Sequence, residues 1–139
     1  SNFCLGATID LGHEIQREVT LTRKKIDNGA QFFLLQSIFD PIQVMEFIEN
    51  YERRYGERLS TPVFCGIQVM STNSSVFGDV PNWVHEDLQK GRSGEDIAIQ
   101  VLGQFVDRGF RSIYLIPPIA SNGRRDYRAA QQVIKVFKE

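Results

Sequence analysis

Residues that build metal, redox and disulfide sites are scarce in this chain. Its 139 residues include two cysteines, two histidines and one tryptophan. Cys4 and Cys65 lie in separate strand-like stretches, without the short spacing of a metal or redox motif. We therefore expect both to be reduced packing residues of a cytoplasmic protein, and we expect no metal site.

Charge of one sign and long apolar runs are also missing. The formal net charge is -1, with both signs interspersed, which gives no electrostatic reason to bind nucleic acid or an anionic membrane. No apolar run approaches the roughly 18 residues of a membrane span, and no leader-like pattern opens the chain. The composition, 42% hydrophobic and 24% charged, predicts one soluble domain over residues 1–139.

Four short apolar stretches have the length of strands. They cover residues 3–9, 32–35, 63–70 and 112–116. Their side chains do not alternate between polar and apolar, which is typical of parallel strands covered on both faces. Segments with helical periodicity separate these stretches, and an additional segment at about residues 71–91 forms an insertion after the third one.

The helical segments carry clear start and stop signals. The clearest helix follows Asp40, the expected N-cap, with Pro41 in its first position and Gly56 as its stop. A second helix begins after Ser93, the expected N-cap of a capping box, and ends before Gly109. Weaker patterns, the last of them capped by Asp126, cover residues 12–29, 81–89 and 124–139.

Strict alternation of strands and helices predicts either a doubly wound sheet or part of a (β/α)8 barrel. A doubly wound nucleotide-binding sheet usually carries a glycine-rich loop after its first strand, whereas residues 8–14, TIDLGHE, contain one glycine. A complete barrel takes about 250 residues and eight βα units. We therefore predict an α/β fold of four βα units that form half of a TIM-type (β/α)8 barrel.

Polar residues follow the strands at their carboxyl ends, where barrels bind their ligands. Gln36 is the most distinctive, because it ends an otherwise apolar strand. The other candidates are Asp10, His13, Ser37, Gln68, Ser71, Thr72, Asn73, Pro117, Pro118, Ser121, Asn122 and Arg124. The set is rich in neutral hydrogen-bonding groups, which favours binding a polar heterocycle over hydrolysis or metal catalysis.

Each candidate also has a plain structural interpretation. Gln36 could bond loop backbone, His13 and His85 could be solvated helix residues, and the basic flank around Lys24 could be a solvated face. Residues 121–126, SNGRRD, would suit an anion because they offer backbone N–H groups and two arginines. A turn followed by an N-cap explains the same residues better.

The stretch Lys25-x-x-x-Gly29-Ala30 is followed, after five residues, by Gln36-x-x-x-Asp40. This pattern resembles the methylenetetrahydrofolate reductase family, in which K-x-x-x-G-A-x-x-x-x-x-Q-x-x-[FY]-D is characteristic. Three later segments, TPVFCGIQVM, DVPNWVHEDL and GQFVDRGFRSIYLIPP, look like later parts of the family's domain. The chain looks most like the bacterial reductases fused to homocysteine methyltransferase domains, and the resemblance covers only the second half of the reductase domain.

The resemblance implies a flavoprotein of one-carbon metabolism and methionine biosynthesis. Such enzymes pass a hydride from NADH or NADPH to FAD and then to 5,10-methylenetetrahydrofolate. The residue matching Gln36 lies over the flavin in the family, so Gln36 is the expected catalytic and substrate-binding residue. We expect Gln68 as a further substrate contact, and the resemblance assigns Glu18 and Lys25 to FAD binding.

Three positions depart from the family pattern. Val69 stands where the family has a proline, Ile9 where an aromatic residue lies against the flavin, and Pro118 where an arginine often follows the last strand. These departures favour one alternative to a working reductase, a folate- or flavin-binding module that has lost catalysis. A second alternative is a structural half-barrel without this cofactor, with a different ligand or none.

A partner is expected on two grounds. The family's acidic residues that polarise folate, and much of its FAD site, belong to the half that this chain does not match. The chain has no initiator Met and its first apolar stretch starts almost at once, as in a piece of a longer protein. A lone half-barrel exposes two sheet edges and an apolar interior, so we expect either the missing N-terminal half or a second copy to cover them.

Overall fold

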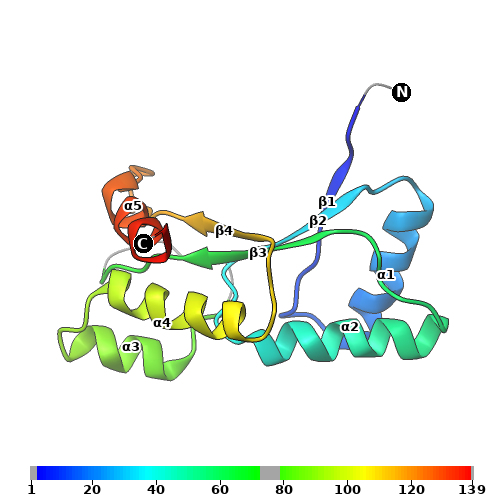
Figure 1. Cartoon of the computed structure of the whole chain (residues 1–139), viewed down its shortest axis with the longest axis horizontal. Coiled ribbons are helices and arrows are strands. Elements are labelled where there is room, and N and C mark those ends of the chain that lie inside the picture. Colours follow the sequence, from blue (N-terminus) through cyan, green and yellow to red (C-terminus); the bar gives the residue numbers. More distant parts are fainter. Residues whose placement is uncertain (1–2, 73–78, 139) are drawn as a thin grey trace.

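The structure, a computed structural model, describes residues 3–72 and 79–138. The strands are β1 (Gly6–Thr8), β2 (Phe32–Leu35), β3 (Val63–Gln68) and β4 (Ile113–Ile116). The helices are α1 (Ile15–Asp27), α2 (Pro41–Tyr55), α3 (Asn82–Gln89), α4 (Gly94–Asp107) and α5 (Tyr127–Lys138). Over the described residues this confirms the α/β class, with a four-stranded parallel sheet and five helices (Figure 1).

The predicted cap residues do set the ends of the helices. The side chains of Asp40, Ser93 and Asp126 each accept a backbone N–H near the start of α2, α4 and α5. Pro41 occupies the first position of α2, where its missing N–H costs nothing. Gly56 ends α2 with a φ of 66°, in the left-handed region that glycine enters without steric penalty.

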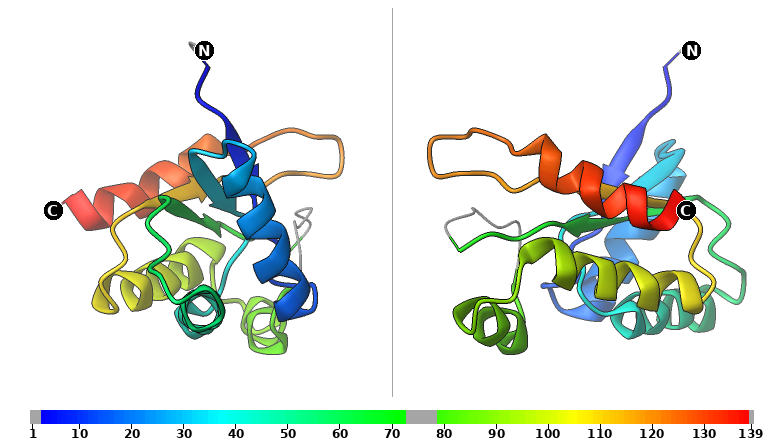
Figure 2. Two further views of the ribbon diagram at one scale, coloured as in Figure 1. Left: turned by 90° about the vertical axis from the view of Figure 1, so that its right-hand side faces the viewer. Right: turned by 60° about the vertical axis from the view of Figure 1, so that its left-hand side comes forward.

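Three strands are shorter than the sequence predicts, and β4 is shorter only by the one residue at its start. β1 covers Gly6–Thr8 of the expected residues 3–9, because the chain before it extends away from the sheet (Figure 2). Phe3 and Leu5 in that segment are 78% and 52% exposed. β3 ends at Gln68 and not at residue 70. The expected insertion contains α3, which follows Pro81 as predicted.

The four strands lie in the order β1-β2-β3-β4, and all are parallel. Each crossover connection therefore leads to the adjacent strand, always in the same direction across the sheet. Parallel crossovers are right-handed, so sequential ones place their helices on the same face. Figure 1 shows α2, α3 and α4 below the sheet and α1 beside β1 and β2 on the right, and α5 packs against α4.

The core lies between the sheet and this helix layer. Phe33 and Ile67 point into it from the strands, and Phe47 and Phe105 meet them from α2 and α4. Each of these side chains is at most 1% exposed, and burying a side chain of this size stabilises the fold by roughly 1.5–3 kcal/mol.

The opposite face of the sheet remains partly open, whereas the sequence predicted strands covered on both faces. We call it the open face; it comprises Phe32, Leu34, Phe64, Gly66 and Tyr114. Phe64 is 36% exposed, and its ring meets the ring of Phe32 edge-to-face at 6.1 Å. A Cβ on Gly66 would lie 2.6 Å from the ring of Tyr114, so this glycine allows the tyrosine to lie across β3.

The two cysteines have different environments. Cys4 is exposed, so the expectation that both cysteines pack in the core is wrong for this one. It lies in the extended segment before β1, which no other element covers within the described residues. Cys65 is fully buried in β3, and burial raises the pKa of its thiol to about 12, because the thiolate would lose its hydration.

We predict that a thiol reagent labels native protein rapidly at Cys4 alone at pH 8, because the buried thiol of Cys65 stays neutral. The second equivalent should react only after unfolding, and a Cys4→Ser variant should lose the rapid phase. Because the pKa of this thiol is raised in the folded state, its contribution to stability is complete at pH values below about 8.5, the pKa of the thiol in the unfolded chain. Stability in urea should therefore fall as the pH rises from about 8.5 towards 12. Two rapid equivalents in native protein would contradict this assignment.

Candidate functional site

A cavity of about 500 Å³ opens at the carboxyl ends of β1 and β2, and we call it the strand-end cavity. It is lined by Thr8, Ile9, Asp10, Leu11, Gly12, His13, Leu34, Gln36, Ser37, Ile38, Gln43 and Asp79. Asp10, His13, Gln36 and Ser37 are four of the predicted rim residues, so the structure brings these four together. Gln43 and Asp79, which come from α2 and from the segment before α3, were not among the residues predicted from the sequence.

Gln36 reaches this cavity because the chain turns abruptly after β2. Ser37 has a φ of 52°, in the left-handed region that side chains other than glycine rarely adopt. Leu35 and Ser37 on either side are buried, whereas Gln36 is exposed and lines the cavity. Such backbone strain is concentrated at functional sites, where the surrounding contacts hold it in place.

A buried polar contact holds the turn. The hydroxyl of Ser37 donates to Oε1 of Gln68 at 2.9 Å, and the two side chains are 5% and 1% exposed. The backbone N–H of Ile38 donates to the carbonyl of Gly66 at 2.9 Å, which ties the same turn to β3. Gln68 therefore lies beneath the cavity wall rather than in it, and its expected contact with substrate stays a prediction.

The loop from β1 to α1 is organised by a buried carboxylate. Glu18 is 3% exposed, accepts the backbone N–H of Asp10 at 3.2 Å and lies 2.8 Å from Nδ1 of His13. Nε2 of His13 lies 3.5 Å from Oδ2 of Asp10. The imidazole therefore bridges two carboxylates in the cavity wall. Its side chain is 46% exposed, in agreement with its interpretation as a solvated residue.

The two residues expected at FAD have partners within the chain. Glu18 is engaged by the loop just described, and Nζ of Lys25 donates to the carbonyl of Thr8 at 2.6 Å. The carbonyl of Leu5 accepts the N–H of Gln31 just before β2, and the N–H of Ile9 donates to the carbonyl of Leu34 in β2. By alternation the carbonyl of Thr8 therefore faces the other edge of β1. Lys25 thus covers the free edge of the sheet, and neither residue lines the strand-end cavity.

The remaining rim candidates lie elsewhere. Ser71 and Thr72 are exposed beyond β3, and Asn73 lies outside the described residues. The loop between β4 and α5, which holds Pro117, Pro118, Ser121, Asn122 and Arg124, projects away from the sheet (Figure 2). Asn122 accepts the N–H of Arg124 at 3.0 Å, and Asp126 caps α5. The proposed anion loop is therefore built as a turn followed by an N-cap.

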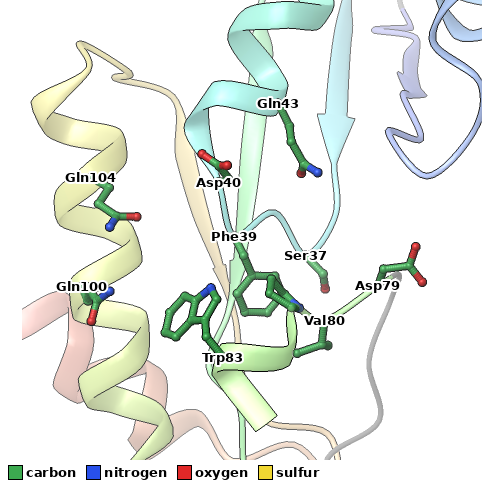
Figure 3. Close-up of a pocket in the computed structure, with 10 residues that line it drawn as sticks. Ser37, Phe39, Asp40, Gln43, Asp79, Val80, Trp83, Gln100 and Gln104 are labelled. Carbon is green, nitrogen blue, oxygen red and sulfur yellow. The ribbon is translucent and has the colours of Figure 1, made fainter. Parts of the chain in front are cut away.

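A second cavity, of about 750 Å³, lies in the helix layer between α2, α3 and α4 (Figure 3). We call it the helix-layer groove. It is lined by Ser37, Phe39, Asp40, Gln43, Asp79, Val80, Pro81, Trp83, Gln100 and Gln104. The sequence did not predict it, because its residues come from three separate segments, 37–43, 79–83 and 100–104. Only the i, i+4 spacing of Gln100 and Gln104 places two of them on one helix face.

Within residues 3–72 and 79–138, no three His, Cys, Asp or Glu side chains form a group that could hold a metal ion. No helix among the same residues is long and apolar enough to cross a membrane. His85 lies exposed on α3, in agreement with its interpretation as a surface residue.

No family model matches the chain, and no curated protein matches it. Among solved structures, the chain is similar to an uncharacterized protein from Clostridium thermocellum that binds two copies of 5-methyl-5,6,7,8-tetrahydrofolic acid. The TM-score is 0.63 at 12% sequence identity, and the similarity covers 99% of this chain and 54% of that chain. The chain thus spans about half the length of this neighbour, and at this identity the likeness shows the fold alone.

We predict that Ser37→Val lowers the free energy of unfolding by about 2–4 kcal/mol, because a β-branched residue is strained at this φ and the hydrogen bond to Gln68 is lost. Ser37→Gly loses the same hydrogen bond but removes the strain, and should stay within about 1 kcal/mol of the natural protein. Urea unfolding of the two variants measures the difference. Equal stability of the valine and glycine variants would show that the turn is not strained.

Proposed function

We propose that this chain binds a folate-type small molecule, with the pterin ring in the strand-end cavity. The observation that carries the proposal is the position of Gln36, whose amide lines a cavity at the carboxyl ends of two parallel strands. A protein with a similar fold binds 5-methyltetrahydrofolate, which supports the ligand class.

The chemistry of the cavity wall suits one end of such a ligand. The amide of Gln36 can donate and accept hydrogen bonds at once, as the edge of a pterin requires. Ile9, Leu11 and Leu34 offer apolar surface to the ring faces. His13 is the one residue of this lining that can carry a positive charge, so the anionic glutamate tail would extend out of the cavity.

The finer proposal is a reductase of the methylenetetrahydrofolate type, in which FAD when bound would relay a hydride from NADH or NADPH. The described residues do not fit FAD by themselves. Glu18 and Lys25 bond to the chain's own loop and strand edge, and the strand-end cavity offers no lysine or arginine to a pyrophosphate. We therefore derive no flavin step from this chain. A reductase that contains it would take its flavin-binding groups from a partner.

The same observation supports a second candidate, a folate-binding module without turnover. Such a module needs the cavity and Gln36 but no flavin. It agrees with the departures at Val69, Ile9 and Pro118 from the family pattern. Flavin absorbance in the purified protein, followed by bleaching with NADH or NADPH, would favour the reductase over this module.

We further propose that the sheet is half of a (β/α)8 barrel. Sequential parallel strands with the helices α1 to α4 on one face are the arrangement of such a barrel. The open face would then be its interior, and the free edge of β1, which Lys25 now covers, would pair with another strand. The structural neighbour is about twice as long, which is the length that a second half would add. The partner is either that second half or another copy of this chain.

We predict that Gln36→Ala weakens the binding of 5-methyltetrahydrofolate by about tenfold or more, measured by calorimetry, because the pterin edge loses a paired donor and acceptor. Gln36→Glu should weaken it as well, since a carboxylate cannot donate. The matched control is Gln132→Ala, on the exposed side of α5 and outside both cavities. Unchanged affinity in both Gln36 variants would remove the role assigned to this amide.

We predict that residues 1–139 produced alone self-associate through the open face. Phe64→Glu should shift the light-scattering mass towards the monomer, because it places a charge in the apolar interface. Phe137→Glu, on an exposed phenylalanine of α5, is the matched control and should leave the mass unchanged. A natural chain that is monomeric would count against the half-barrel.

A further inference from the structure

The helix-layer groove combines aromatic surface with amide groups. Trp83 from α3 and Phe39 from the turn before α2 lie next to each other in its floor (Figure 3). Trp83 is half-buried, so part of the indole remains accessible from the groove. An aromatic ring in this position can stack on a flat ligand, and base-on-aromatic stacking does not depend on which base is present.

Three amides surround this aromatic floor. Gln100 and Gln104 lie one turn apart on the same side of α4, and Gln43 lies on α2 across the groove (Figure 3). All three are exposed, and within the described residues none of the three side chains is held by another protein group. Glutamine can pair with the amino group and the neighbouring ring nitrogen of adenine at the same time.

The charged groups of the groove are all acidic. Asp40 and Asp79 line it, and no lysine, arginine or histidine does. One carboxylate oxygen of Asp40 accepts the N–H of Ile42 at 2.9 Å, which leaves the other oxygen as an acceptor. The groove therefore favours a ligand with N–H donors and disfavours a phosphate, which two carboxylates would repel.

We propose that the helix-layer groove binds an aminopurine base or nucleoside that carries no phosphate. The purine ring stacks on Trp83, the amides of Gln100 and Gln104 pair with its amino group and ring nitrogens, and Asp40 accepts a further N–H. This site is distinct from the pterin site proposed for the strand-end cavity and does not rest on it. The two cavities adjoin, since Ser37, Gln43 and Asp79 line both.

The single tryptophan of the chain makes the test direct. Adenosine and guanosine are titrated into the protein while the fluorescence of Trp83 is recorded. We expect saturable quenching by at least one of the two. AMP should bind at least threefold more weakly than adenosine at low ionic strength, and the difference should shrink when salt screens the two carboxylates.

Three variants decide which residues hold the ligand. Gln100→Ala combined with Gln104→Ala should raise the adenosine Kd about tenfold or more, and circular dichroism should show an unchanged fold because both positions are exposed. Gln36→Ala should leave the adenosine Kd unchanged, whatever it does to folate binding. Trp83→Phe, followed by calorimetry, should retain weaker binding because the smaller ring still stacks.

Three results would overturn the proposal. The first is that neither nucleoside quenches the fluorescence saturably at millimolar concentration. The second is that the double glutamine variant binds adenosine as tightly as the natural protein. The third is that maltose, a neutral sugar that can also stack on indole, saturates the signal while the nucleosides do not.

Discussion

The direction in which the chain winds governs the rest of this structure. Because every crossover steps to the next strand on the same side, the helices α1 to α4 gather on one face of the sheet. That face receives the core, and the other face keeps Phe64 and its neighbours partly in water. A soluble domain rarely leaves a sheet of aromatic residues uncovered. The proposed half-barrel accounts for this arrangement with one assumption, that further strands continue the same winding.

The two cavities follow from the same architecture. Parallel strands end at one edge of the sheet, so the turns after β1 and β2 form the strand-end cavity there. The helix-layer groove forms where residues of α2, α3 and α4 come together. Ser37 lies in the walls of both, and its hydroxyl is bonded to the buried Gln68.

Much of the fold could be predicted from local sequence, because helix ends depend on a few neighbouring residues. Asp40, Ser93 and Asp126 were recognisable as caps without any tertiary information. The strand bounds and the open face were harder to predict from the sequence. Phe32 and Phe64 are apolar residues whether a helix, a partner or water covers them. Gln36 stood out in the sequence because it breaks an apolar run.

The rest of the candidate site depends on long-range contacts. Nothing near Lys25 in the sequence indicates that its amine bonds to Thr8, since a side-chain hydrogen bond of this kind needs the helix already docked on the strand. The groove around Trp83 is similar, because it draws on α2, α3 and α4 at once. His13 was visible as a residue but not as a group held between two carboxylates.

The bond from Lys25 to the edge of β1 has a consequence for assembly. Proteins often guard a sheet margin with a proline or a bulge, and either device is fixed in the backbone. Here the free edge of β1 is covered by the side chain of Lys25, which can rotate away without any change of the main chain. A strand that adds to this edge would compete with the ammonium group of Lys25 for a single carbonyl, that of Thr8. The same edge can therefore resist non-specific aggregation and still accept a partner strand that forms a full set of backbone hydrogen bonds.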